Sequence, residues 1–256
     1  MDIQNLCSEE AIQYNRQIIL PEITSQGQIK LKQARVLIAG VGGLGSVSAY
    51  YLAAAGIGSI RIVDCDCVES GNLNRQIIHG TGDIGKPKTL SALEKLRNLN
   101  PYCDVEPIQE FISDENILPM VESCTVILDG TDNLKARKIL NRASILKDIP
   151  FIYGGVEGFT GMVSTFVPGQ TPCLECFFSQ DTEQKDPIGI IGPIPGVIAS
   201  IQSLEAIKLI LGIGKLLTNK LLIFNGMSMS FRKIEVEKNP DCPVCGGNTD
   251  FNRSVK

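Results

Sequence analysis

The sequence predicts an α/β fold with a mostly parallel sheet that antiparallel strands extend. Short apolar runs, which suit parallel strands buried on both faces, alternate with helical segments over residues 35–153. After residue 154 the pattern changes, because glycine, proline and cysteine separate shorter segments. With 256 residues, 43% of them hydrophobic, the chain is long enough to bury one large core.

The expected elements follow in chain order. Residues 1–34 predict two helices, over 9–19 and 23–31, ahead of the sheet. Apolar runs bounded by turn residues predict the strands 36–39, 60–63, 105–108, 125–128 and 151–153. The helices expected between these strands cover 46–55, 87–99 and 134–146. The chain then adds a long apolar helix, 197–211, and two hairpin-like segments, 221–224 and 231–236.

A glycine-rich loop joins the first strand to the helix after it. Gly40, Gly42, Gly43 and Gly45 fit the pattern G-x-G-x-x-G in the strand-to-helix context that makes it informative. Such glycines let the backbone approach a phosphate, and the helix N-terminus offers it unpaired N–H groups. Asp64 closes the next strand, where an acidic side chain commonly accepts hydrogen bonds from ribose. A Rossmann-like site for an adenosine nucleotide is therefore predicted, although these residues do not separate NAD from ATP. The alternative is that the glycines only pack helix on strand and that Asp64 only ends the strand.

Two Cys-x-x-Cys pairs lie in the second half of the chain. Cys173 and Cys176 form one pair and Cys242 and Cys245 the other, and each turn can present two thiolates to one tetrahedral ion. Four thiolates leave no open coordination position, so the prediction is one structural Zn²⁺. Two thioredoxin-like redox pairs, or unligated buried thiols, are the alternatives. The other five cysteines are then free thiols: Cys7, Cys65, Cys67, Cys103 and Cys124.

Composition and charge narrow the class of partner. The formal net charge of −4 argues against a protein that binds nucleic-acid backbones. No segment has the roughly 18 to 20 uninterrupted apolar residues of a membrane span, and residues 1–10 resemble neither a secretory signal nor a transit peptide. A cytoplasmic protein in a reducing compartment is expected, with no membrane and no nucleic-acid partner. The single histidine, His79, has no neighbouring carboxylate and is expected to be structural.

Further motifs occur in a characteristic order. They are Tyr14–Leu20, Gly40–Gly45, Asp64-Cys65-Asp66, Asn72–Gln76, Gly85-Lys86-Pro87-Lys88, Asp129–Asn133, the apolar helix near Gln202–Lys208, and both cysteine pairs. In this order and spacing the chain resembles the MoeB/ThiF/HesA family, relatives of the ubiquitin-activating enzymes. The resemblance covers nearly the whole chain. It implies one ThiF-type adenylation domain over 1–256, with N-terminal helices over 1–34, a nucleotide-binding half over 35–153 and a mixed half with the zinc site over 154–256.

The residues near the expected phosphate site suit phosphate chemistry better than hydride transfer. Asn72, Arg75 and Lys88 are amide and cation donors that follow a nucleotide-binding strand. Resemblance to the family implies that Asp132 helps to hold Mg²⁺ at the triphosphate, and that Asp66 and Asn133 belong to the nucleotide site. It also implies that Arg16 reaches the γ-phosphate of a neighbouring subunit, which makes the protein a homodimer. Taken singly, Arg16 and Lys88 are also explained as solvated surface charges, and Asp132-Asn133 as a helix cap.

The family resemblance implies a reaction. ATP binds the glycine loop and Asp64, and the C-terminal glycine carboxylate of a ubiquitin-like sulfur-carrier protein ending in Gly-Gly attacks the α-phosphate and releases pyrophosphate. Arg16, Arg75, Lys88 and Asp132 with Mg²⁺ are the expected catalytic groups. Two alternatives stay open: an NAD-dependent oxidoreductase with structural zinc, and a non-catalytic scaffold that only binds a partner protein. The sequence does not say whether the carrier serves molybdopterin, thiamin, tRNA thiolation or a peptide metabolite.

One stretch departs from part of the family. Some members carry a cysteine shortly after the first Cys-x-x-Cys pair that can bond covalently to the activated carrier or to sulfur. Here Ser179–Gly192 contains no cysteine, and Lys185-Asp186-Pro187 stand in that place. The product is therefore expected to remain an acyl-adenylate. Cys65 and Cys67 are the remaining covalent candidates, and packing or incidental thiols are the favoured interpretation for both.

Overall fold

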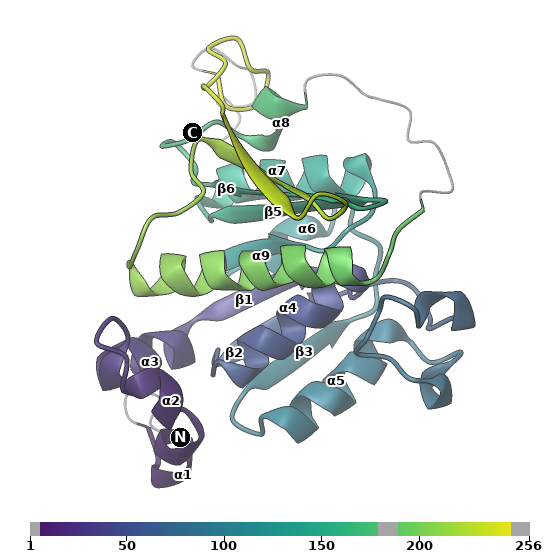
Figure 1. Ribbon diagram of the computed structural model, residues 1–256, viewed down its shortest axis with the longest axis vertical. Coiled ribbons are helices and arrows are strands. Elements are labelled where there is room, and N and C mark those ends of the chain that lie inside the picture. The colour runs from purple at the N-terminus through teal and green to yellow at the C-terminus, as the bar shows by residue number, and fades with distance from the viewer. Residues whose placement is uncertain (1–5, 179–188, 247–256) are drawn as a thin grey trace.

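The computed structural model describes residues 6–178 and 189–246, and within them it has an eight-stranded sheet flanked by helices (Figure 1). In chain order the strands are β1 (Arg35–Ala39), β2 (Ser59–Val63), β3 (Asp104–Ile108), β4 (Val126–Asp129), β5 (Phe151–Glu157), β6 (Thr160–Phe166), β7 (Lys220–Asn225) and β8 (Ser230–Glu235). The helices are α1 (Ser8–Gln13), α2 (Asn15–Ile18), α3 (Thr24–Gln33), α4 (Gly43–Ala54), α5 (Lys88–Leu99), α6 (Ile117–Val121), α7 (Leu134–Lys147), α8 (Leu174–Phe177) and α9 (Pro193–Leu211).

The sheet has a parallel part and an antiparallel part. Its strand order is β3-β2-β1-β4-β5-β6-β7-β8, so β3 and β8 are its two edges. Neighbouring strands from β3 to β5 pair in parallel, and from β5 to β8 they pair antiparallel. β1 lies between β2 and β4, so the strand order reverses there and leaves a crevice at the carboxyl ends of the strands. The predicted fold class is confirmed, and a crevice of this kind is where open α/β sheets bind their ligands.

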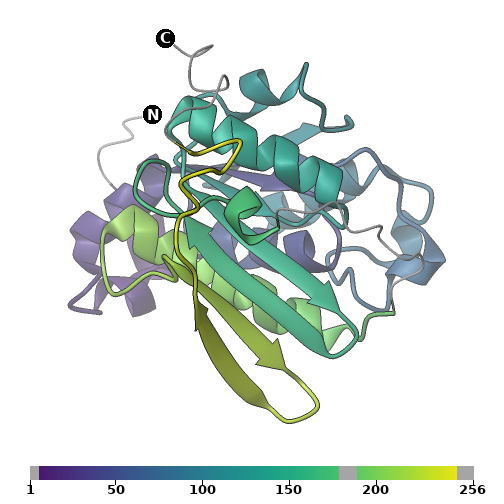
Figure 2. The same cartoon turned by 90° about the horizontal axis from the view of Figure 1, so that it is seen from above.

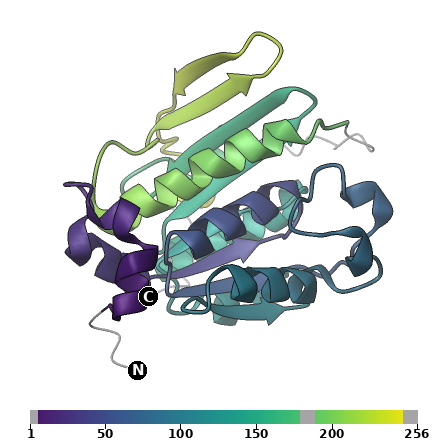
Figure 3. The ribbon, with the colours of Figure 1, turned by 60° about the horizontal axis from the view of Figure 1, so that its bottom comes forward.

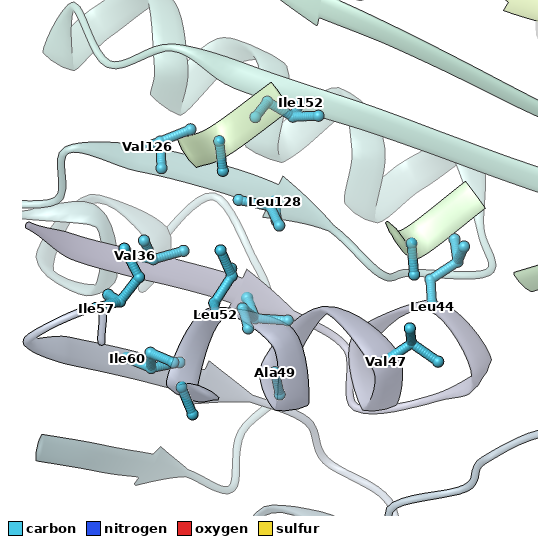
Figure 4. Packing of buried hydrophobic residues seen from close by; sticks show 14 of the residues in the cluster. Val36, Leu44, Val47, Ala49, Leu52, Ile57, Ile60, Val126, Leu128 and Ile152 are labelled. Carbon is cyan, nitrogen blue, oxygen red and sulfur yellow. The ribbon is translucent and has the colours of Figure 1, made fainter. Parts of the chain in front are cut away.

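Helices cover both faces of the sheet. α4, α5 and α9 lie on one face, where α9 runs beside α4 (Figure 3). Figure 4 shows part of the core beneath them, with Val36, Ile60, Val126 and Ile152 from neighbouring strands and Leu52 from α4. α6 and α7 cover the other face, with Leu37, Ile127 and Phe151 buried beneath them. Strands buried on both faces explain why the first half reads as continuous apolar runs.

The second half departs most from the expected elements. β5 continues through Gly154 and Gly155 to Glu157, and the unpredicted strand β6 pairs with it over its whole length. The β7–β8 hairpin extends beyond β6 and is visible as the projecting pair of strands in Figure 2. The N-terminal helix expected over 9–19 is divided at Tyr14, a buried residue that ends α1.

α9 is long and largely apolar. Among the described residues it is the one helix long and apolar enough to cross a membrane. It nevertheless packs against α4, β5 and β6, and its residues Ile198, Ala199 and Ala206 are fully buried in the core. Gln202 and Glu205 interrupt its apolar surface and bond to groups inside the protein. α9 is therefore a core helix of this fold.

Candidate active site

A cavity of about 960 Å³ opens at the carboxyl ends of the central strands. Most of the predicted nucleotide residues line it: Gly40, Gly42, Gly43, Asp64, Asp66, Arg75, Lys88, Asp132 and Asn133. Three segments contribute them, namely the loop after β1, the region that follows β2, and the loop after β4. The chain thus brings the predicted residues together at the point where the strand order reverses.

The glycines of the loop after β1 are required for different structural reasons. Gly40 has a positive φ of 88°, and a Cβ there would lie 2.6 Å from the carbonyl oxygen of Gly130 in the β4–α7 loop. A Cβ at Gly45 would lie 1.9 Å from the carbonyl oxygen of Gly40, so Gly45 permits close packing of α4. Gly45 does not line the cavity. The alternative that a glycine here only packs the helix on the strand therefore fits Gly45.

Asp64 holds the glycine loop in place. Its carboxylate accepts hydrogen bonds from the backbone N–H of Val41 at 2.7 Å and from that of Asp66 at 2.9 Å. Burial raises the pKa of Asp64 above its ordinary value, although the ammonium of Lys88 acts in the opposite direction. Each carboxylate oxygen has a second lone pair, so hydrogen bonds to the backbone leave Asp64 able to accept others.

Lys88 is not a solvated surface charge. Its side chain is 7% exposed, and its Nζ lies 2.8 Å from a carboxylate oxygen of Asp66. The hydrogen bond from Lys88 holds the pKa of Asp66 below its ordinary value. The backbone N–H of Lys88 donates to the carbonyl of Asp66 at 2.9 Å, which fixes the start of α5 against the loop after β2. A buried ammonium at the cavity wall is placed to meet an anion there.

Asp132 and Asn133 lie in the loop between β4 and α7. Asn133 is the N-cap of α7, because its Oδ1 accepts a hydrogen bond from the backbone N–H of Ala136 at 2.8 Å. The cap interpretation therefore holds for Asn133, which also lines the cavity. Asp132 is exposed at the cavity wall, and its carboxylate accepts a hydrogen bond of 3.4 Å from the Asn133 amide. Its oxygens are of the hard type that Mg²⁺ prefers.

Arg75 lines the cavity, whereas Asn72 and Arg16 do not. The Arg75 guanidinium donates to the carbonyl of Gly71 and to the side-chain oxygen of Asn74, both at 2.9 Å. The side-chain oxygen of Asn72 accepts from the backbone N–H of Glu69 at 3.2 Å, which stabilises the same loop. Arg16 lies exposed on α2, away from the cavity of its own chain.

Asp129 and Arg137 form a buried pair that the sequence did not reveal. The Arg137 Nε donates to the Asp129 carboxylate at 2.9 Å, and the guanidinium also donates to the carbonyls of Thr131 and Gly154. Thr131 donates to Asp129 with its hydroxyl at 2.7 Å and its backbone N–H at 2.9 Å. These bonds tie the loop that carries Asp132 to the adjacent strand β5. Asp129 belongs to the Asp129–Asn133 motif, but nothing in the sequence singles out Arg137 as its partner, since pairing across eight positions and a turn needs the folded chain.

His79 is structural, as expected. It is 6% exposed, and its ring nitrogens lie 2.8 Å from the Ser91 hydroxyl and 3.2 Å from the carbonyl of Val41. Burial lowers its pKa, so the ring favours the neutral form. It thereby links α5 to the glycine loop without contributing a charge.

The four cysteines of the two pairs converge at one point. Cys173 and Cys242 have their sulfurs 3.6 Å apart, those of Cys176 and Cys245 are 3.4 Å apart, and all four lie within 4.8 Å of one another. A tetrahedral Zn²⁺ with bonds of about 2.3 Å places its sulfur ligands roughly 3.8 Å apart, so the spacing fits. The backbone N–H of Gly246 donates to the carbonyl of Cys242 at 2.9 Å, as in a tight metal-binding turn.

A buried amide beside this cluster also fits an anionic metal site. Asn141 of α7 is 1% exposed, and its oxygen accepts from the backbone N–H of Leu174, next to Cys173, at 3.0 Å. Its Nδ2 has no hydrogen-bond partner within normal distance among the described atoms. In structural metal sites such outer-shell donors face the ligand sulfurs, and the Asn141 side chain interacts with the Cys173 sulfur. The residues present therefore fit Zn²⁺.

Known proteins resemble this chain in both sequence and fold. The model of the ThiF family matches residues 14–244. SAMP-activating enzyme E1 of Haloferax volcanii is 39% identical over 238 residues, which cover 91% of this chain and 88% of that protein. Sulfur carrier protein adenylyltransferase of Thermus thermophilus is 38% identical over 248 residues, or 93% and 92% of the two chains. The crystal structure of E. coli MccB with ATP has a TM-score of 0.80 and 28% identity, and covers 91% of this chain and 74% of that chain.

The family match extends from the first predicted motif, near Tyr14, to the second cysteine pair. These two relatives match this chain over nearly their whole length, so the similarity includes both the half with the glycine loop and the half with the cysteines. The chain belongs to the ThiF family.

Proposed function

We propose that this chain binds Mg-ATP in the cavity and adenylates the C-terminal glycine carboxylate of a ubiquitin-like sulfur-carrier protein ending in Gly-Gly. Its relatives are named adenylyltransferases, and the chain is an enzyme of that type. The observation that carries the assignment to the cavity is the meeting of the glycine loop, the buried Lys88 and Asp132 around one space. An NAD-dependent oxidoreductase is not favoured, since the relatives transfer adenylyl groups.

The proposed reaction is an in-line displacement at the α-phosphorus. A carboxylate oxygen of the carrier forms a bond to that phosphorus, the bond to the bridging oxygen breaks, and pyrophosphate leaves. The carrier carboxylate is already ionised at neutral pH, so the enzyme needs no general base. Lys88 and Arg75 would neutralise charge on the triphosphate, and Asp132 would hold Mg²⁺, which supplies further charge compensation.

Several wider features belong to the same proposal. A homodimer in which Arg16 completes the neighbouring site is supported by the exposed place of Arg16 on α2. One domain over 1–256 is supported by the continuous sheet from β3 to β8. A structural Zn²⁺ is supported by the four converging sulfurs, and a cytoplasmic location by cysteines that remain thiols throughout the described residues.

The decisive test is ATP:pyrophosphate exchange against a panel of carrier proteins ending in Gly-Gly. We expect exchange with one carrier and none with the same carrier lacking its last two glycines. Exchange that does not depend on any carrier, or none with the whole panel, would contradict the proposed substrate class. Bound NAD in the purified protein would revive the oxidoreductase alternative.

Replacing Lys88 with Ala should act mainly on turnover. The ammonium lies at the cavity wall, where its charge matters most as the triphosphate reorganises, so we expect kcat to fall by about a hundredfold with a smaller change in KM for ATP. Lys86→Ala is the matched control, because Lys86 lies two positions before Lys88 and forms a surface pair with Glu94. A change in KM alone would make Lys88 a ground-state binder of ATP.

Cys65 should be a poor nucleophile. Burial, followed by the charge of Asp66, raises the pKa of the Cys65 thiol to about 11, so it remains protonated at neutral pH. We expect slow alkylation of Cys65 by iodoacetamide at pH 7.5 compared with the exposed thiol of Cys67. After incubation with ATP and carrier, intact mass should show no thiol-reversible adduct at either residue. The stretch without cysteine, Ser179–Gly192, lies outside the described residues over 179–188.

A further inference from the structure

The segment that leads into α9 links three parts of the nucleotide site. Gly189 and Ile191 bond to the backbone of Gly158 at the β5–β6 turn, at 2.7 and 3.4 Å. The chain then enters α9, whose first residues reach the glycine loop. Pro195 packs closely on Gly43, where an added Cβ would lie 3.2 Å from the proline ring. The same Cβ would lie 3.7 Å from the carbonyl oxygen of Arg75.

Gly192 touches the backbone of the segment that carries Arg75. A Cβ at Gly192 would lie 2.4 Å from the carbonyl oxygen of Asn74 and 3.5 Å from the Cα of Arg75. The backbone of Gly192 itself is ordinary, with φ −50° and ψ −39°, a conformation that any residue adopts. Glycine is therefore required here by the close contact and not by backbone strain.

Asn74 is also the residue that holds the Arg75 side chain. Its Oδ1 accepts from the Arg75 guanidinium at 2.9 Å, and the backbone N–H of Arg75 donates to the carbonyl of Asn72 at 3.1 Å. A displacement of Asn74 therefore moves both the main chain of Arg75 and the acceptor that aims its guanidinium. Gly192 thus contacts Asn74, and Asn74 in turn holds the Arg75 guanidinium at the cavity wall.

We propose that Gly192 is a positioning residue for Arg75, and that its close contact with Asn74 sets where the Arg75 guanidinium lies in the nucleotide cavity. The inference rests on the proposed function, in which Arg75 neutralises charge on the triphosphate. It connects the start of α9, and through Gly158 the β5–β6 turn, to the group that meets ATP. A small displacement of a catalytic group costs a large factor in rate, since alignment contributes much of the acceleration.

The test is a double-mutant cycle measured by pyrophosphate exchange with the cognate carrier. Gly192→Ala should lower kcat by about tenfold or more while the protein unfolds cooperatively near the wild-type Tm. In an Arg75→Ala background the same substitution should have almost no further effect, because it acts through the missing guanidinium. Gly196→Ala is the matched control, since Gly196 lies one turn further along α9 and nothing lies within 4 Å of a Cβ there.

The outcomes distinguish the proposed role of Arg75 from the positioning role of Gly192. Full activity of Arg75→Ala would contradict the proposed role of Arg75. A large loss of activity in Arg75→Ala would support the role of Arg75. The positioning role of Gly192 would still be overturned if Gly192→Ala were as active as Gly196→Ala. It would also be overturned if the losses from Gly192→Ala and Arg75→Ala multiplied in the double variant. If Gly192→Ala does not fold, Asn74→Ala replaces it in the cycle, because it removes the acceptor that holds the Arg75 guanidinium and adds no atom. Its effect should be smaller and equally dependent on Arg75, and independence from Arg75 would overturn the proposal.

Discussion

Asp132→Ala should abolish Mg-ATP-dependent pyrophosphate exchange while leaving the fold intact. Asp132 is exposed at the cavity wall, so its removal opens no hole in the core. Loss of the carboxylate would leave the metal without its protein ligand where triphosphate charge must be compensated, and we expect a loss of at least about a hundredfold. Exchange measured over a range of Mg²⁺ concentrations, with Tm alongside it, checks this.

Asp104→Ala is the matched control for the same change of charge. Asp104 is exposed on the edge strand β3 and does not line the cavity. It should keep wild-type exchange. Near-normal exchange by a folded Asp132→Ala variant at every Mg²⁺ concentration would remove Asp132 from the proposed mechanism.

Cys242→Ser should lower the thermal stability of the protein more than it changes the affinity for ATP. Cys242 is fully buried among the three other sulfurs, and the cluster fastens the C-terminal segment to the α8 region. Loss of the metal should lower Tm on the order of 10 °C, because a structural zinc site contributes folding free energy directly. The variant should contain less than one zinc per chain by elemental analysis, and chelation of the wild type should lower Tm similarly.

Cys124→Ser separates loss of zinc from loss of a buried thiol. Cys124 is also buried, but it lies outside the cluster. The control should keep one zinc per chain and show the smaller change in Tm. An unchanged Tm together with lost activity in Cys242→Ser would argue that the ion takes part in the reaction.

Most of the first half of the fold was predictable, because its strands and longer helices carry their own signals, whereas the short helix α6 was not predicted. Strands buried on both faces read as apolar runs, and Gly56 and the Asn133 cap mark helix boundaries. β6 was missed because Gly161 and Ser164 interrupt the apolar residues of Thr160–Phe166, and the strand gains its pairing from β5 and β7. Such a strand is stabilised by its neighbours more than by its own propensity.

The residues of the candidate site likewise include some that the sequence predicts and some that it does not. Residues within a local motif, such as Gly40 and Asp64, could be predicted, because spacing along the chain determines where they lie. The Asp129–Arg137 pair and the contact of Gly192 with Asn74 could not, since each depends on how separate elements pack. Arg16 and Asn72 stay predictions, as neither reaches the cavity of its own chain.

The two edges of the sheet bear on how this protein meets other chains. The edge strand β3 contains Pro107, which has no N–H to offer, and β8 at the other edge carries Arg232, Lys233 and Glu235. A proline and a row of charges both discourage a foreign strand from adding to a sheet, which is the usual first step of β-aggregation. An enzyme that, as proposed, receives the flexible tail of another protein while leaving two sheet edges unpaired is thereby protected against pairing with strands of its own copies.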